Sequence, residues 1–213
     1  ALFVGATNVK TGKIRVFKDN EISTDVLLAS ACLPTMFQAV EIGGEHYWDG
    51  GYTGNPALFP LFRPDFPRDI VVININPLER DAVPRSAQDI QNRINEISFN
   101  SSLIKEMRAI AFVKKLIRDD MLKDEYKDNF TDVLVHSIRA DEALEEQSVA
   151  SKFNSDWDFL TMLRDKGRET MDAWLKKHFD DIGKRDTVDV EKEYLKSTSE
   201  KIAERRARNK KKG

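Results

Sequence analysis

The sequence has few of the residues that build metal sites and disulfides. Its 213 residues include a single cysteine, Cys32, so no intrachain disulfide can form. The three histidines, His46, His136 and His178, lie far apart and belong to no HxxxH or Cys/His cluster, which is the spacing that zinc sites use. We therefore predict no metal and no organic cofactor. His136, inside the apolar segment VLVHSI, is interpreted as a hydrogen-bonded strand residue rather than a ligand.

Other absences exclude further classes of protein. No apolar run approaches the roughly 18–20 residues of a membrane span. Neither GxxxxGK[ST] nor GxGxxG occurs, so the sequence has no phosphate-binding loop. The net charge of −2 gives no overall attraction to nucleic acid, and the basic end KIAERRARNKKKG lacks the interleaved aromatic residues of many RNA-binding segments.

Short alternating and apolar runs at the start of the chain predict strands. Residues 2–4 and 14–17 are expected to pair across a turn at Gly12. Paired glycines at 43–44 accept the positive φ of a tight turn and predict a second hairpin, whose second strand ends at Asp49. Because the chain opens on a strand and has no initial Met, we expect it to begin inside a domain.

A helix and a proline-rich loop are predicted around these hairpins. Ser23 or Thr24 can cap a helix over residues 25–33, which Pro34 is expected to end. Residues 55–67 carry several prolines, each of which restricts φ and removes a hydrogen-bond donor. This segment is therefore expected to be a loop packed by its own Phe and Leu side chains.

The later part of the chain alternates strands and helices. Residues 69–76 form a Val/Ile run typical of a strand buried on both faces of a parallel sheet, and residues 131–140 predict a further strand. A capping box at Ser86 and helical periodicity predict a helix toward residue 121, broken near Asn100. A second helix is expected from residue 155 to a point near Gly183. Its apolar side would carry Trp157, Leu160, Met171, Trp174 and Leu175. This order of elements predicts an α/β protein with a helical C-terminal extension.

Four segments of the sequence, in order, resemble a known family. They are LFVGATNVKTGKIRVF, LLASACLPTMFQAVEI, YWDGGYTGNPALFPLF and DIVVININ. Asp-Gly alone is a common turn dipeptide, but the four segments together resemble the C-terminal half of the patatin-like phospholipase family over residues 2–77. The resemblance implies a three-layer α/β/α fold with a mainly parallel central sheet, incomplete at its N-terminus. On that reading residues 1–85 are the C-terminal part of the catalytic domain, residues 86–187 continue it, and residues 188–213 are a charged, basic tail that frays after residue 187.

The resemblance also implies an activity and a site. Patatin-like enzymes are serine lipid acyl hydrolases that use a Ser-Asp dyad, and Asp49 matches their catalytic aspartate. Gly50 and Gly51 complete the DGG motif, and Asn55 is interpreted as support for the following loop. Desolvation by Tyr47, Trp48 and the Phe/Pro loop would raise the basicity of Asp49. The implied partner is a lipid or another acyl ester, polyesters included, with peripheral membrane contact through the apolar loop or the basic tail.

One departure from the family concerns the nucleophile. The sequence has no GxSxG elbow and no glycine-rich oxyanion loop, and Ser30 lies in a predicted helix without flanking glycines. We expect the nucleophile and the oxyanion hole to lie before residue 1, so that this segment alone is inactive.

Two alternatives remain open at this point. A non-catalytic patatin-fold interaction module would also lack the nucleophile, and a basic-tailed nucleic-acid binder would depend on residues 201–213. The ester, the acyl position, the oligomeric state and the compartment stay undetermined, with a cytoplasmic or peripheral-membrane location favoured.

Overall fold

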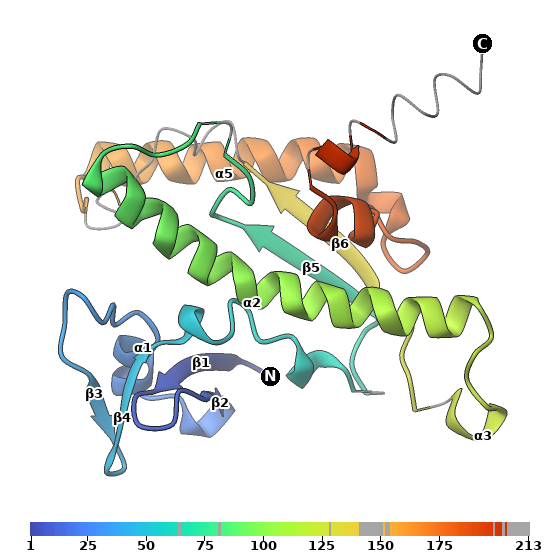
Figure 1. Ribbon diagram of the computed structural model, residues 1–213, viewed down its shortest axis with the longest axis horizontal. Coiled ribbons are helices and arrows are strands. Elements are labelled where there is room, and N and C mark those ends of the chain that lie inside the picture. Colours follow the sequence, from blue (N-terminus) through green and yellow to red (C-terminus); the bar gives the residue numbers. More distant parts are fainter. Residues whose placement is uncertain are drawn as a thin grey trace. The chain divides into compact units, whose positions relative to one another are not determined.

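A computed structural model describes residues 1–63, 65–80, 82–127, 129–140, 151, 154–197, 199–201 and 203 (Figure 1). The chain divides into two compact units. The first contains Ala1–Phe66 and Leu78–Glu106, and the second contains Pro67–Pro77 and Met107–Gly213.

The first unit is built on a four-stranded antiparallel sheet in the order β2-β1-β4-β3. Its strands are β1 (Phe3–Asn8), β2 (Ile14–Lys18), β3 (Val40–Ile42) and β4 (Glu45–Asp49). Both predicted hairpins are confirmed. Gly12, Gly43 and Gly44 have φ values of 65°, 61° and 80°, which side chains other than glycine adopt at a cost.

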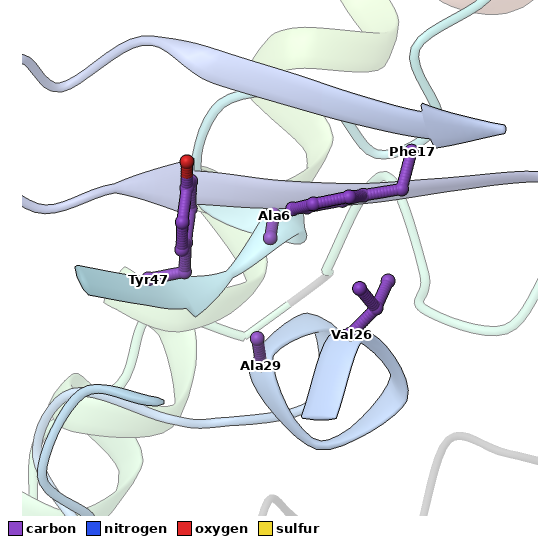
Figure 2. Packing of buried hydrophobic residues seen from close by; sticks show 5 residues of the cluster. All are labelled: Ala6, Phe17, Val26, Ala29 and Tyr47. Atoms are coloured by element: carbon purple, nitrogen blue, oxygen red, sulfur yellow. The ribbon is translucent and has the colours of Figure 1, made fainter. Parts of the chain in front are cut away.

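The core of this unit lies between the sheet and helix α1 (Thr24–Ser30). Figure 2 shows Val26 and Ala29 of α1 facing Ala6, Phe17 and Tyr47 of the strands. Ser23 caps the helix, as predicted, by accepting a hydrogen bond from the Val26 N–H.

Helix α1 ends earlier than the sequence predicts. The expected end at residue 33 is wrong, because the helix stops at Ser30. The chain then turns, and the Cys32 carbonyl accepts a hydrogen bond from the Asp49 N–H at 2.9 Å. The chain after Ser30 therefore contacts β4 through Cys32, two residues before Pro34.

The segment after β4 contains two short 3₁₀ turns, η2 (Gly50–Tyr52) and η3 (Phe59–Leu61), and is otherwise irregular, as its prolines predict. Helix α2 (Ala87–Arg118) follows, with Ser86 accepting a hydrogen bond from the Asp89 N–H as expected of a cap. The predicted break near Asn100 is wrong, since α2 continues through it. The Ser101 and Ser102 hydroxyls donate hydrogen bonds to the carbonyls of Ser98 and Phe99, one turn earlier, so these polar side chains have partners within the helix.

The second unit contains a two-stranded parallel sheet, as predicted. Strand β5 (Asp69–Asn74) pairs with β6 (Leu134–Arg139) in a register that aligns Asp69 with Leu134. Burial of β5 on both faces is wrong, because Val71, Ile73 and Ile75 are exposed while the residues between them are buried. The continuous Val/Ile run thus reflects one buried face and one apolar face exposed to solvent.

Helices α3 (Asp124–Lys127) and α5 (Trp157–His178) complete the regular structure of this unit. Asp156 caps α5 by accepting hydrogen bonds from the N–H groups of residues 158 and 159. The expected inward positions of Trp157 and Leu160 are wrong, since their side chains are 74% and 43% exposed.

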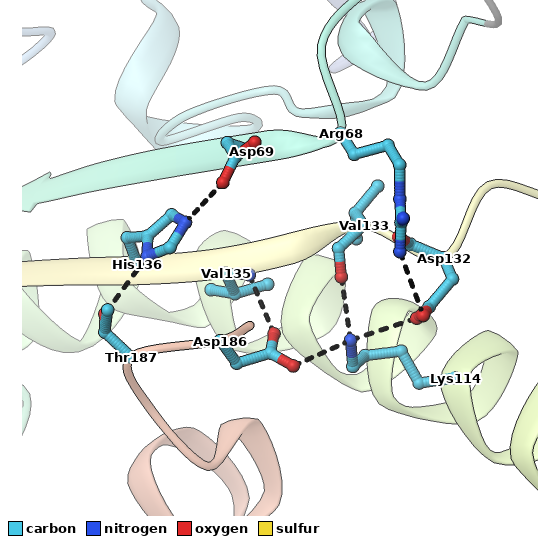
Figure 3. Close-up of polar contacts among 9 residues, drawn as sticks. All are labelled: Arg68, Asp69, Lys114, Asp132, Val133, Val135, His136, Asp186 and Thr187. Atoms are coloured by element: carbon cyan, nitrogen blue, oxygen red, sulfur yellow. Dashed lines mark hydrogen bonds and ion pairs between the residues drawn. The ribbon is translucent and has the colours of Figure 1, made fainter. Parts of the chain in front are cut away.

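A polar network holds the parallel sheet (Figure 3). His136 is fully buried, and its Nε2 lies 2.8 Å from Asp69 Oδ1. Its Nδ1 lies 3.3 Å from the Thr187 hydroxyl, which confirms the interpretation of His136 as a hydrogen-bonded strand residue. Lys114 bonds the carboxylates of Asp132 and Asp186, and Asp186 accepts the Val135 N–H.

The chain does not fray directly after residue 187, which corrects that expectation. The Thr187 N–H donates to the Val135 carbonyl, and Val190 and Tyr194 are buried. The Tyr194 hydroxyl donates to Ser137 Oγ at 3.0 Å. Two apolar anchors and a hydrogen bond therefore hold η6 (Glu191–Leu195) in this unit. Residues 204–213 of the basic tail lie outside the described residues.

The described residues thus form a mixed α/β protein with an antiparallel sheet, a parallel sheet and helices. Among them, no helix is long and apolar enough to cross a membrane. No cluster of three or more His, Cys, Asp or Glu residues in this part of the chain could hold a metal ion.

Candidate functional site

Asp49 is the last residue of β4, and its backbone is fixed from both sides. It pairs with Ala6 of β1, and its N–H donates to the Cys32 carbonyl at 2.9 Å. Its own carbonyl accepts a hydrogen bond from the Thr7 hydroxyl at 2.7 Å. The side chain turns back on the following backbone, where Oδ1 accepts the Gly51 N–H at 2.7 Å. The carboxylate is therefore oriented by the DGG turn itself.

A second layer of hydrogen bonds closes this turn. The Thr7 and Thr53 hydroxyls lie 2.8 Å apart and bond each other. The N–H groups of Thr53 and Gly54 both donate to the Gly50 carbonyl, at 3.0 and 2.8 Å. Thr7, on β1, thus links the backbone of Asp49 to the end of the turn.

Gly50 is required by a close approach of backbone. A Cβ atom at this position would lie 2.2 Å from the Gly5 carbonyl oxygen and 2.5 Å from the Gly5 carbonyl carbon. Neither distance is tolerable, and β1 is held between β2 and β4. The first glycine of the DGG motif therefore allows the turn to pack directly on β1.

Gly51 is required by side chains. A Cβ atom there would lie 2.8 Å from two ring carbons of Phe99 and 3.1 Å from Asp49 Oδ1. The Phe99 ring also packs edge-on against Tyr52, with ring centroids 5.1 Å apart. An aromatic wall thus lies next to the amide that orients the Asp49 carboxylate.

The negative charge of Asp49 affects the pKa values of two nearby groups, the Tyr52 phenol and the Cys32 thiol. Burial raises the pKa of the Tyr52 phenol, and the negative charge of Asp49 raises it further. The same two causes, in the same order, raise the pKa of the Cys32 thiol. Both groups remain neutral near neutral pH, so the carboxylate lies among uncharged neighbours on these sides.

Cys32 is not suited to act as a nucleophile. Its side chain is 5% exposed, and its thiol donates to the Gln38 carbonyl at 3.1 Å. Reactive cysteines need a lowered pKa and access to solvent, and Cys32 has the opposite of both. Cys32 is therefore a buried structural residue of this site.

Asn55 is anchored through its backbone. Its N–H donates to Ser102 Oγ at 2.7 Å, and the Asn55–Pro56 peptide is cis. This contact connects the segment after the turn to α2.

Glu106 of α2 provides a second contact to the same segment and carries a testable pH dependence. Its carboxylate accepts the Leu58 N–H at 3.4 Å, and burial raises its pKa above the ordinary value of 4.5 despite that bond. A raised pKa means that folding favours the neutral form. The favourable contribution of Glu106 to stability is thus complete below pH 4.5 and is lost as pH rises through its folded pKa.

Replacing Glu106 by Gln is therefore expected to increase the free energy of unfolding at pH 7. The gain should shrink toward pH 4, because there the native carboxyl is also neutral. Urea unfolding of both proteins at the two pH values measures this difference. Glu45→Gln serves as the control of opposite sign, since the hydrogen bond from Asn8 lowers the pKa of Glu45. A loss of stability in Glu106→Gln that is larger at pH 7 than at pH 4 would contradict the expectation.

The structure brings Asp49, Gly50 and Gly51 together in one short turn, with Asn55 four residues beyond it. The two aromatic residues before Asp49 have other contacts. Tyr47 lies in the core and accepts a hydrogen bond from Arg15, and the Trp48 indole donates to the Phe37 carbonyl. Sequence reasoning missed the neighbours that the structure does show around the turn, which are Thr7, Cys32, Tyr52, Phe99 and Ser102. For Phe99 and Ser102 the sequence offers only their helical spacing, and such spacing does not show which segment the helix face contacts.

The chain was compared with known proteins. No curated protein matches it. A family model of lipid hydrolases matches its N-terminal end, and the matched segment contains β1 to β4, α1 and the whole DGG turn. The resemblance seen in the sequence is thereby confirmed for this segment: residues 5–62 match the family described as patatin-like phospholipase.

Proposed function

We propose that Asp49 is the general base of a serine lipid acyl hydrolase that uses a Ser-Asp dyad. The observation that carries this proposal is the family match over residues 5–62, inside which Asp49 ends β4 and is oriented by the Gly51 amide. Patatin-like phospholipases act on lipids, so the proposed substrate is a carboxylic ester of a lipid.

The proposed reaction has two stages. A serine hydroxyl attacks the ester carbonyl, and Asp49 accepts the hydroxyl proton as the new C–O bond forms. The proton passes to the departing alcohol, which leaves an acyl-serine. Asp49 then takes a proton from water as it attacks the acyl-serine, and the serine recovers that proton when the fatty acid is released.

The serine must come from outside these 213 residues, because they contain no GxSxG elbow and no glycine-rich oxyanion loop. In this proposal a further part of the protein supplies both groups, and the whole domain has a three-layer α/β/α fold. A base alone does not hydrolyse an ester at enzymatic rates, so the 213-residue chain by itself is expected to be inactive.

The neutral neighbours of Asp49 support a role as a base. A carboxylate in water, with a pKa near 3.9, is a weak proton acceptor. The Cys32 thiol and the Tyr52 phenol, whose pKa values the charge of Asp49 raises, bring no positive charge to the carboxylate.

A non-catalytic interaction module is the second candidate, and the absence of the nucleophile motif from this sequence favours it. The test compares the full-length protein with its Asp49→Asn variant in the hydrolysis of a phospholipid and of a p-nitrophenyl ester, alongside the 213-residue chain. Hydrolysis that needs Asp49 supports the enzyme. An inactive full-length protein, or one that is indifferent to Asp49, would favour the module. Hydrolysis by the 213-residue chain that Asp49→Ala abolishes would contradict the need for an external serine.

A further inference from the structure

Helix α2 presents a stripe of side chains to the segment that follows the DGG turn. Four residues at spacings of four, three and four lie on one face of the helix. Asn95 and Phe99 both face residues 51–52, whereas the partners of Ser102 and Glu106 follow at residues 55 and 58. The stripe consists of Asn95, Phe99, Ser102 and Glu106.

The first contacts of the stripe lie beside the catalytic turn. Phe99 is 6% exposed, and its ring fills the space in which a Gly51 side chain would lie. It also packs against Tyr52, whose hydroxyl donates to Asn95 Oδ1 at 3.4 Å. Since the Gly51 N–H bonds the Asp49 carboxylate, a shift of Gly51 would change the direction of that carboxylate.

The next contact is a buried hydrogen bond. Ser102 is 7% exposed, and its hydroxyl accepts the Asn55 N–H at 2.7 Å while donating to the Phe99 carbonyl at 3.2 Å. A buried backbone N–H without an acceptor is unfavourable, so the bond fixes the register of the segment on the helix. Glu106 adds the bond to Leu58 further along.

We propose that Ser102 and Phe99 are positioning residues for Asp49, which they act on through residues 51–55. Neither touches the reacting atoms. They hold the DGG turn against α2, and the turn in turn fixes the Asp49 carboxylate through the Gly51 amide. This inference rests on the proposed function of Asp49. Displacing a catalytic group by about 1 Å can cost on the order of 10²-fold in rate, so a bond two contacts away can control turnover.

Ser102→Ala in the full-length protein tests this proposal. We expect kcat for a lipid ester to fall by about 10-fold to 100-fold, because Asp49 is displaced. KM should change less than 3-fold, because the residues that bind the substrate are not altered. Hydrogen exchange of peptides covering residues 49–58 should accelerate at least about 10-fold relative to peptides covering residues 3–18. Phe99→Leu, which keeps an apolar side chain but removes the ring beside Gly51, should have the same two effects.

Ser101→Ala is the matched control. The Ser101 hydroxyl donates to the Ser98 carbonyl at 2.8 Å, as Ser102 does to Phe99, so the control removes the same helical bond. It should change neither kcat nor exchange in residues 49–58.

The outcomes separate this inference from the proposed function. Equal effects of Ser101→Ala and Ser102→Ala, or a Ser102→Ala variant with native kcat and native exchange, would overturn the positioning role. If Asp49→Asn keeps full activity, the proposed function fails, while faster exchange in Ser102→Ala alone would still show that α2 holds the turn.

Discussion

Asp49→Asn in the full-length protein is expected to slow hydrolysis of a lipid ester by about 10³-fold or more while leaving the fold in place. Asparagine has the same shape as aspartate, and its Oδ1 can still accept the Gly51 N–H. It cannot take a proton from a serine hydroxyl. General-base catalysis contributes about 10²–10⁴-fold, and here the same group acts in both stages of the reaction.

The measurement is kcat/KM on a p-nitrophenyl ester and on a phospholipid, with circular dichroism and thermal unfolding to show that the fold is kept. A loss of 10³-fold corresponds to about 4 kcal/mol of transition-state stabilisation. Asp65→Asn is the matched control, since Asp65 is a carboxylate of the same unit that pairs with Arg63 at the surface. A variant of Asp49 that keeps more than a tenth of the native activity would show that Asp49 is not the base.

Gly50→Ala is expected to lower the free energy of unfolding of the first unit by about 3 kcal/mol or more. The added methyl group would lie 2.2 Å from the Gly5 carbonyl oxygen and 3.1 Å from the Ala6 amide nitrogen. These atoms belong to β1, which is hydrogen-bonded on both edges and cannot retreat without breaking its pairing with β2. The turn must therefore move away from the sheet, and Asp49 moves with it.

Urea unfolding followed by circular dichroism measures this effect. Gly167→Ala provides a control of opposite sign, because Gly167 lies inside α5 with no atom within 4 Å of an added Cβ. Alanine in a helix interior is more favourable than glycine by about 0.5–1 kcal/mol. If Gly50→Ala unfolds within 1 kcal/mol of the native protein, the close packing of the DGG turn on β1 is wrong.

The part of the fold that could be predicted from the sequence depends on short-range signals. The positive φ of Gly43 and Gly44, the Ser23 cap and the strand at residues 69–74 all follow from residues within a few positions of one another. The predictions that failed concern where a helix ends and which face of a strand is buried. Helix α1 ends early because Cys32 bonds Asp49, and one face of β5 is exposed although its sequence is apolar throughout.

The candidate site divides in the same way. Asp49 and the two glycines were found from sequence because they are adjacent and match a family over residues 5–62. The residues that hold the turn were not found, since the partners are separated by 47 residues for Asn55 with Ser102 and by 42 for Thr7 with Asp49.

By itself the sequence determined the hairpins and predicted the DGG turn with its candidate carboxylate, because local backbone preferences and a contiguous motif indicate these. Only the tertiary structure showed why Gly50 and Gly51 are needed: Gly5 leaves no room for a side chain at Gly50, and Phe99 leaves none at Gly51. It also showed which face of α2 contacts the segment after the turn. The physical reason is that periodicity shows that a face will be buried, whereas the partner of that face is chosen by packing between distant segments.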